Sequence, residues 1–453
     1  MARDRRRRGT SSKGGQRRDA ARKPGAPRGK QRELPVGMPR YDNAWTLVLN
    51  AGRSTTVMAG HPWVYSGAIE FAIKPTSVDI KAGQACVLLD HRGFYLGYGY
   101  YNAESQIAAR VVGLADTDDP PQEAPDMAKE VRDRLGAAWQ LRKQVGLFTD
   151  DRGAWRLCNS AGDSLPGLAI DQYGDGAVAV VSTAGAALWL DDVVQWLMSR
   201  GKCKWVVSRA PIDAHPSEGL VRGILRLDGD VPERIDVQHH GIEVAVAPRD
   251  GAKTGLFTDQ WDNHIEVAKL CEGRFVVDAY CHTGSFGLHA AKAGASRVLC
   301  VDASQRACDL AEASAKAAGL SQVEVHCADA VHVLRNFADD EGSKDKERPS
   351  VVIVDPPKFA THGARVEDAL RKYTHLNSAA LDALGDEGWL VSCSCSGRVD
   401  TQTFLRMLAH AARRSGRILS LVELRGAGHD HPSAPAHDEG RYLKVAICRV
   451  RKR

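Results

Sequence analysis

The 453-residue sequence contains no run of about 18 apolar residues, so it offers no candidate for a membrane-spanning helix. Its N-terminus is charged but lacks the apolar segment of a secretory signal peptide. None of its 11 cysteines forms a C-x-x-C pair, and they are scattered without regular spacing. These absences argue against a disulfide framework and against a zinc motif. We therefore predict reduced thiols, no metal and a cytoplasmic location.

The net charge of +5 is unevenly distributed along the chain. Residues 1–33 contain 13 of the 61 basic and 3 of the 56 acidic residues, which gives this segment +10 and the remainder −5. The segment has few large apolar residues, so a disordered basic tail is predicted over residues 1–40. A basic arm binds phosphate backbones without sequence preference, which makes RNA a candidate partner. A solubilising extension without a partner is the alternative.

The first folded segment has short apolar stretches broken by glycines, typical of a small β-barrel, and we place it at residues 41–117. An acidic, proline-rich linker, DTDDPPQEAP, follows. Residues 125–240 combine helical apolar spacing with several strand-like runs and predict a central α+β domain.

From residue 241 the pattern changes to alternating apolar strands and amphipathic helices. Strands this apolar are covered on both faces, which indicates a parallel sheet in an α/β fold. The last two runs, ILSLVEL and RYLKVAICRV, would complete the sheet as an antiparallel edge pair. We therefore predict a Rossmann-like domain over residues 241–453 in a multidomain α/β protein.

Four of these strands end in acidic residues, at the edge where open α/β sheets bind ligands. The four residues are Asp278, Asp302, Asp329 and Asp355. Gly284 and Gly287 allow a tight turn before the first helix, but the loop lacks G-x-G-x-x-G. Carboxylates repel phosphate and tolerate a cationic ligand, so the pattern favours S-adenosylmethionine (SAM) over a dinucleotide.

Several segments resemble one family in the same order along residues 45–450. They are GHPWVYSGAIE, LPGLAIDQYGD, DGAKTGLFTDQWDNH, VVDAYCHTGSFGLHAAKAG, DPPKFA, SCSG and EGRYLKV. These motifs are similar to those of the bacterial class I SAM-dependent 23S ribosomal RNA (cytosine-5) methyltransferase family. The resemblance implies a PUA-like RNA-binding barrel, a central α+β domain and a C-terminal methyltransferase domain, with large-subunit ribosomal RNA as partner.

The same resemblance implies which residues line the SAM site. They are Asp278, Gly284, Asp302, Asp329 and Asp355, with Lys253, Asp259 and Gln260 in a loop over the methionine end. A helix N-cap cluster is the alternative interpretation of Asp259 to Asn263.

The stretch VSCSCSG contains the candidate nucleophile. Carbon 5 of cytosine is a poor nucleophile, and a thiolate added to carbon 6 converts the ring into an enamine that attacks the methyl group. Cys393 should lie about 6–7 Å deeper in the sheet than Cys395, so we assign Cys395 as nucleophile and Cys393 to the core. Asp355 would hold the flipped cytosine. Lys358 stands where many RNA cytosine-5 methyltransferases have a second cysteine, so a two-cysteine mechanism is not expected.

Two other functions remain open at this point. One is methylation of a guanine nitrogen, which needs no cysteine, and the other is a non-catalytic PUA-domain assembly factor. A homodimer is left open as well.

Four aromatic residues of the barrel are expected to be mostly core, with one or two able to stack on bases: Trp63, Tyr65, Phe94 and Tyr100. Arg371 to Tyr373 are candidates to flank the substrate channel. His429, His431 and His437 are interpreted as part of a polar loop.

Overall fold

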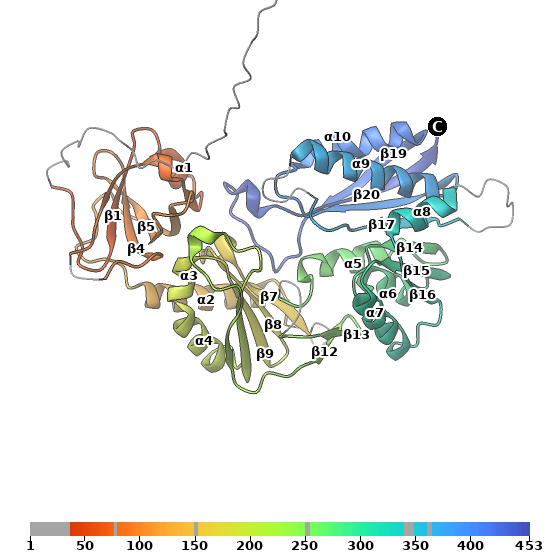
Figure 1. Ribbon diagram of the computed structural model, residues 1–453, viewed down its shortest axis with the longest axis horizontal. Coiled ribbons are helices and arrows are strands. Elements are labelled where there is room, and N and C mark those ends of the chain that lie inside the picture. The colour runs from red at the N-terminus through yellow and green to blue at the C-terminus, as the bar shows by residue number, and fades with distance from the viewer. Residues whose placement is uncertain (1–36, 77–78, 149–152, 250–253, 339–347, 360–364) are drawn as a thin grey trace, which may run out of the picture. The chain divides into compact units, whose positions relative to one another are not determined.

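The computed structural model describes residues 37–453 except 77–78, 149–152, 250–253, 339–347 and 360–364 (Figure 1). Most of the predicted basic tail and Lys253 therefore lie outside the described residues. No helix among the residues described is both long enough and apolar enough to span a membrane.

The N-terminal part is a six-stranded sheet that encloses a small core, in the order β2-β6-β5-β4-β1-β3. Its inward-facing residues include Leu47, Leu88 and Val111. Gly97 and Gly99 allow strands β5 and β6 to approach closely, because a side chain at either would strike the backbone of β6. The elements are β1 (Trp45–Leu49), α1 (Ser54–Met58), β2 (Trp63–Val64), β3 (Ile69–Ile73), β4 (Gln84–Leu89), β5 (Tyr95–Tyr101) and β6 (Ala109–Leu114).

The middle part packs helices against a five-stranded sheet in the order β11-β10-β9-β8-β7. Asp126 is the N-cap of helix α2, and its side chain accepts hydrogen bonds from the backbone N–H groups of Ala128 and Lys129. The elements are α2 (Met127–Gln144), β7 (Ala154–Asn159), β8 (Leu168–Tyr173), β9 (Gly176–Val181), α3 (Ala184–Leu188), α4 (Leu190–Ser199), β10 (Trp205–Ala210) and β11 (Gly223–Asp228). A separate hairpin, β12 (Ile235–His239) and β13 (Ile242–Val246), follows.

The C-terminal part is a seven-stranded sheet in the order β16-β15-β14-β17-β18-β20-β19. Only β20 breaks the parallel arrangement, since it pairs antiparallel with both β18 and β19. The strands are β14 (Phe275–Ala279), β15 (Arg297–Asp302), β16 (Val323–Cys327), β17 (Val351–Val354), β18 (Glu387–Ser394), β19 (Arg417–Arg425) and β20 (Lys444–Lys452). The predicted Rossmann-like sheet and its antiparallel edge pair are confirmed.

Helices cover both faces of this sheet because side chains alternate along each strand. In β14, Phe275 and Val277 belong to one core, whereas Val276 belongs to the core on the opposite face. Helices α8, α9 and α10 contact one another in series, as do α5, α6 and α7. Their bounds are α5 (Trp261–Ala268), α6 (Ser285–Lys292), α7 (Gln305–Ala317), α8 (Ala330–Ala338), α9 (Val366–Ala383) and α10 (Thr401–Arg414).

Candidate functional site

The loop from β14 to α6 has an unusual backbone. Tyr280 and His282 adopt positive φ angles of 65° and 51°, and Gly284 follows with a φ of 80° at the start of α6. Positive φ costs energy in residues with a Cβ and tends to occur at functional sites. Gly287 is required for packing, because a Cβ there would lie 2.4 Å from Sγ of Cys300. The first turn of α6, directly after the loop, is therefore packed closely against β15.

Asp278 supports this loop from inside the protein. Its side chain is fully buried, and Oδ2 accepts a hydrogen bond from the backbone N–H of Gly287 at 2.8 Å. Oδ1 has no hydrogen-bond partner among the described residues. Burial, together with the charges of Asp355 and Asp302, raises the pKa of Asp278 to about 7. One oxygen of this buried carboxyl, Oδ1, thus remains available to accept a hydrogen bond from a ligand.

Asp302 and Asp329 lie at the ends of the next two strands. The carboxylate of Asp302, half-buried, accepts hydrogen bonds from the backbone N–H groups of His282 at 3.0 Å and Ser304 at 2.9 Å. Asp329 is exposed and accepts from the backbone of His332 at 2.8 Å. Asp302 therefore links the first loop to the second, while Asp329 supports the first turn of α8.

Asp355 and Cys395 lie at the same edge of the sheet on neighbouring strands. β17 and β18 are parallel, with Val354 opposite Ser392. Continuing this register places Asp355 level with Cys393, and Cys395 two residues, or about 6–7 Å, beyond it. Cys393 is fully buried, whereas Cys395 and Asp355 are half-buried. Burial raises the pKa of the Cys393 thiol far above its ordinary value.

Gln260 connects these two strands. Its Nε2 donates to Oδ2 of Asp355 at 3.0 Å, and its side chain lowers the pKa of the Cys393 thiol, against the larger effect of burial. Gln260 is the residue before α5, but its side chain does not cap that helix. Asp259 instead accepts a hydrogen bond from the hydroxyl of Tyr442 at 2.6 Å. The N-cap interpretation of this segment is wrong, because its side chains point to the sheet edge and the C-terminal loop.

Tyr373 supports the turn that contains Cys395. It is fully buried, and its hydroxyl lies 3.0 Å from the hydroxyls of both Ser394 and Ser396. The ring packs against Phe359, with centroids 4.8 Å apart. Of the three residues expected to flank a substrate channel, only Arg371 and Lys372 are exposed. Tyr373 lies behind the turn and connects it to the Asp-Pro-Pro loop.

A buried lysine beside Cys395 was not predicted from the sequence. Lys444 is opposite Ser394 in the β18–β20 register and is only 3% exposed. Its ammonium donates to the carbonyls of Ser396 at 2.7 Å and Tyr442 at 2.8 Å. Burial lowers its pKa to about 8, and the electrostatic effect of Cys395 opposes that shift. Only the position of EGRYLKV relative to SCSG in the folded sheet reveals this pair.

The histidine-rich connection between β19 and β20 is largely buried. Asp430 is fully buried, and its carboxylate binds the backbone N–H of Arg156 at 2.8 Å and Nδ1 of His431 at 2.7 Å. His431 and His437 are 8% and 6% exposed, and only His429 is mainly exposed. His437 also packs edge-on against Trp63 of β2, with centroids 4.5 Å apart. The polar loop expected here is packed against both preceding parts of the chain.

The aromatic residues of the barrel fall into two groups. Tyr100 is fully buried and bonds the carbonyl of Pro166 at 2.8 Å, as expected of a core residue. Tyr65 and Phe94 are 49% and 48% exposed, so they are the two rings of this set that the expectation left able to stack on bases. Their exposed rings are available to stack on a ligand.

Comparison with known proteins relates two segments of the chain to known domain families. Residues 47–113 match a family model described as a PUA-like domain, and residues 276–344 match one described as a methyltransferase domain. The chain is 34% identical over 411 residues to ribosomal RNA large subunit methyltransferase I of Shewanella denitrificans, covering 89% of this chain and 99% of that protein. The protein of the same name from Aeromonas hydrophila is 33% identical over 414 residues, covering 90% and 99%.

Solved structures share the fold at lower sequence identity. A candidate SAM-dependent methyltransferase from Streptococcus mutans matches with a TM-score of 0.73 and 18% identity, over 89% of this chain and 99% of that one. A candidate methyltransferase in complex with SAH matches with a TM-score of 0.74 at the same identity and coverage. At this identity the likeness establishes the three-part architecture: PUA-like half-barrel, middle α/β domain and Rossmann-like sheet.

Proposed function

Since the chain belongs to the ribosomal RNA large subunit methyltransferase I family, we propose that it methylates carbon 5 of a cytosine in large-subunit ribosomal RNA. The chain is a SAM-dependent ribosomal RNA methyltransferase at the level of its family. The finer assignment, cytosine and a covalent adduct, depends on one observation. Cys395 and Asp355 follow adjacent strands at one sheet edge, and Gln260 donates a hydrogen bond to Asp355 there.

The residues at the β14, β15 and β16 ends fit SAM. SAM supplies a methyl group activated by a sulfonium, and it carries an ammonium and a ribose but no phosphate. The free Oδ1 of Asp278 and the half-buried carboxylate of Asp302 suit such a ligand, whereas neither suits a phosphate. Gly284 would allow close backbone approach. Asp329 and Lys253 are proposed at the periphery, although Lys253 lies outside the described residues.

Cys395 is the proposed nucleophile. Its thiolate forms a bond to carbon 6 of the cytosine, and carbon 5 then takes the methyl group. Loss of the carbon 5 proton restores the ring double bond and breaks the carbon–sulfur bond. The ammonium of Lys444, next to Cys395, would favour the thiolate over the thiol.

Asp355 is the proposed partner of the base. Its carboxyl would bind the ring nitrogen and the exocyclic amine as the sulfur adds. The buried Pro356 stiffens the loop, and Gln260 fixes one carboxylate oxygen. The base must leave its stack to reach this edge, so a target in a loop or an unwound strand is expected.

The PUA-like barrel is proposed to hold the RNA. Tyr65 and Phe94 present exposed rings on this domain, and a ring of this kind stacks on bases without sequence preference. The domain limits inferred from the sequence, 41–117, 125–240 and 241–453, stay our working division of these roles.

Nucleoside analysis tests this proposal. The full-length protein is incubated with labelled SAM and unmodified large-subunit ribosomal RNA, and the RNA is digested to nucleosides. We expect the label in 5-methylcytidine. Label in a methylguanosine would contradict the covalent mechanism and indicate direct attack on the methyl group by a guanine nitrogen. Absence of both labelling and SAM binding would indicate a non-catalytic RNA-binding protein.

A further inference from the structure

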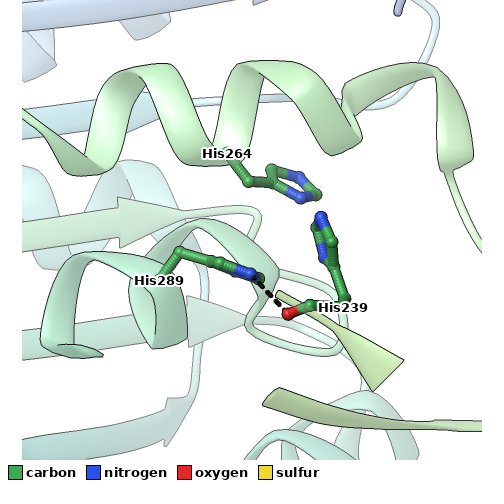
Figure 2. Close-up of side chains that lie close together, drawn as sticks. All are labelled: His239, His264 and His289. Carbon is green, nitrogen blue, oxygen red and sulfur yellow. Dashed lines mark hydrogen bonds between the residues drawn. The ribbon is translucent and has the colours of Figure 1, made fainter. Parts of the chain in front are cut away.

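Three histidines from three separate elements meet in the protein interior (Figure 2). His239 ends β12, His264 is in α5, and His289 is in α6. They are 0%, 4% and 3% exposed, and one ring nitrogen from each lies within 4.8 Å of the other two. Histidine is the commonest protein ligand of transition metals.

The hydrogen bonds of His289 match those of a metal ligand. Its Nδ1 lies 2.7 Å from the carbonyl of Ser285, and its Nε2 lies 3.1 Å from the carbonyl of His239. A neutral imidazole has a single N–H, so it satisfies only one of these two oxygens. When Nδ1 donates to Ser285, the lone pair of Nε2 faces the oxygen of His239, and a cation bound by both atoms would remove that repulsion. A carbonyl on the outer nitrogen is also the usual support of a metal-bound histidine.

His264 supplies an independent observation. Its Nδ1 is buried and has no hydrogen-bond partner among the described residues. An unsatisfied buried polar atom is costly, and a bound ion is one way to satisfy it. Burial lowers the pKa of His264 and of His289, so both rings present neutral lone pairs.

We propose that His239, His264 and His289 bind one divalent transition-metal ion, with Zn²⁺ as the representative ion. Imidazole nitrogen is a preferred donor for zinc, copper, nickel and iron. Zinc–nitrogen bonds of about 2.0–2.1 Å place two ligands of a tetrahedral ion about 3.4 Å apart, so the rings need only small rotations to close on an ion. The carbonyl oxygen of His239 is placed to be the fourth ligand.

The ion would have a structural role. It would fasten the β12–β13 hairpin to α5 and α6, and α5 follows directly on Gln260. The ring of His239 stacks on Trp261 at 3.9 Å, which already orders this junction. No metal was expected from the sequence because its cysteines form no C-x-x-C pair. The three histidines follow one another at intervals of 25 residues and form no local motif. This inference is independent of the proposed methyl transfer.

Metal titration of the full-length, untagged protein tests the proposal. The protein is stripped with a chelator, and Zn²⁺ is titrated against a chromogenic competitor. We expect one tight equivalent per chain and a raised thermal unfolding midpoint. His264→Gln and His289→Gln should each weaken binding by more than the roughly 10–100-fold typical of losing a supporting group. The matched control is His410→Gln, an exposed histidine in α10, which should bind like the wild type.

Cobalt separates this site from adventitious binding by the cysteines, one of which, Cys327, is exposed. Co²⁺ bound by nitrogen and oxygen gives visible ligand-field bands without a sulfur charge-transfer band, and this spectrum supports the proposal. A sulfur band, no tight equivalent in the wild type, or unchanged binding in both folded variants would overturn it. Circular dichroism establishes whether the variants fold, and if they do not, the wild-type cobalt spectrum decides.

Discussion

Nε2 of Gln260 donates a hydrogen bond to Oδ2 of Asp355 across 3.0 Å, from the start of α5 to the end of β17. The orientation of the Gln260 amide is fixed from behind, because Asn263 donates to its Oε1 at 2.7 Å. Arg425 in turn donates to Oδ1 of Asn263 at 2.7 Å. These three hydrogen bonds connect Arg425 of β19 to the proposed base-binding carboxylate of Asp355, and they orient the Gln260 amide so that its N–H group donates to that carboxylate.

Gln260→Glu should remove the hydrogen bond to Asp355 without changing the size of the side chain. A glutamate cannot donate to Asp355 and brings a second negative charge to it. Hydrogen bonds to charged groups contribute about 1.5–3 kcal/mol, so we expect kcat to fall about 10–100-fold at neutral pH. Steady-state kinetics measure this, with the exposed Gln402→Glu as control. Equal kcat in both variants would show that the bond has no part in turnover.

Cys395→Ala and Cys393→Ala should have opposite effects. The first removes the proposed nucleophile at the half-buried position, so turnover should be lost while SAM binding by calorimetry survives. The second removes a fully buried thiol and should lower the free energy of unfolding by about 1 kcal/mol while turnover persists. Full turnover in Cys395→Ala would eliminate the covalent mechanism.

Lys444→Met should shift the pH dependence of kcat/KM. The pKa of Lys444 is lowered to about 8, so below that pH its ammonium is charged and stabilises the neighbouring thiolate. Without the charge, the thiol requires a higher pH to ionise, and the acidic limb of the profile should move up by about one pH unit. Lys444→Arg keeps a charge and should retain the wild-type limb. An unmoved limb in the methionine variant would separate Lys444 from the nucleophile.

Asp278→Asn should become relatively more stable as pH rises. Burial raises the pKa of Asp278 from 3.8 to about 7, so the folded state holds a proton that the unfolded state releases between these values. In that window the contribution of Asp278 to stability decreases as pH increases. Denaturant unfolding of the SAM-free protein measures this effect. Between pH 5.5 and 7, the free energy of unfolding of the variant relative to that of the wild type should rise by about 1–2 kcal/mol. A constant difference would indicate an ordinary pKa for Asp278.

Tyr65→Ala and Phe94→Ala should weaken RNA binding and leave folding intact. Both rings are about half exposed, so their removal takes little from the core. A base stacked on either ring would lose about 1–3 kcal/mol of binding free energy. Fluorescence anisotropy with a ribosomal RNA fragment measures the affinity, and thermal unfolding monitors stability. Unchanged affinity in both variants would place the RNA elsewhere.

The sequence by itself determined the architecture and the order of the motifs. Apolar runs such as VVIV in β17 and the alternation of helix and strand are local, and burial on both faces of a sheet requires them. The acidic residues at or just after the carboxyl ends of β14, β15, β16 and β17 were predictable for the same reason, since parallel strands bring these ends to one edge. The depth of Cys393 relative to Cys395 also followed from strand geometry alone.

Only the tertiary structure decided which side chains surround those positions. Gln260 is 95 residues from Asp355, Lys444 is 49 residues from Cys395, and the three histidines come from a hairpin and two helices. Their convergence depends on strand order, register and helix packing, which no periodicity within one segment records. The exposure of Tyr65 and Phe94 and the burial of the β19–β20 connection depend on the same packing. Residue type sets what a side chain is able to do, and packing against distant segments sets which partner it meets.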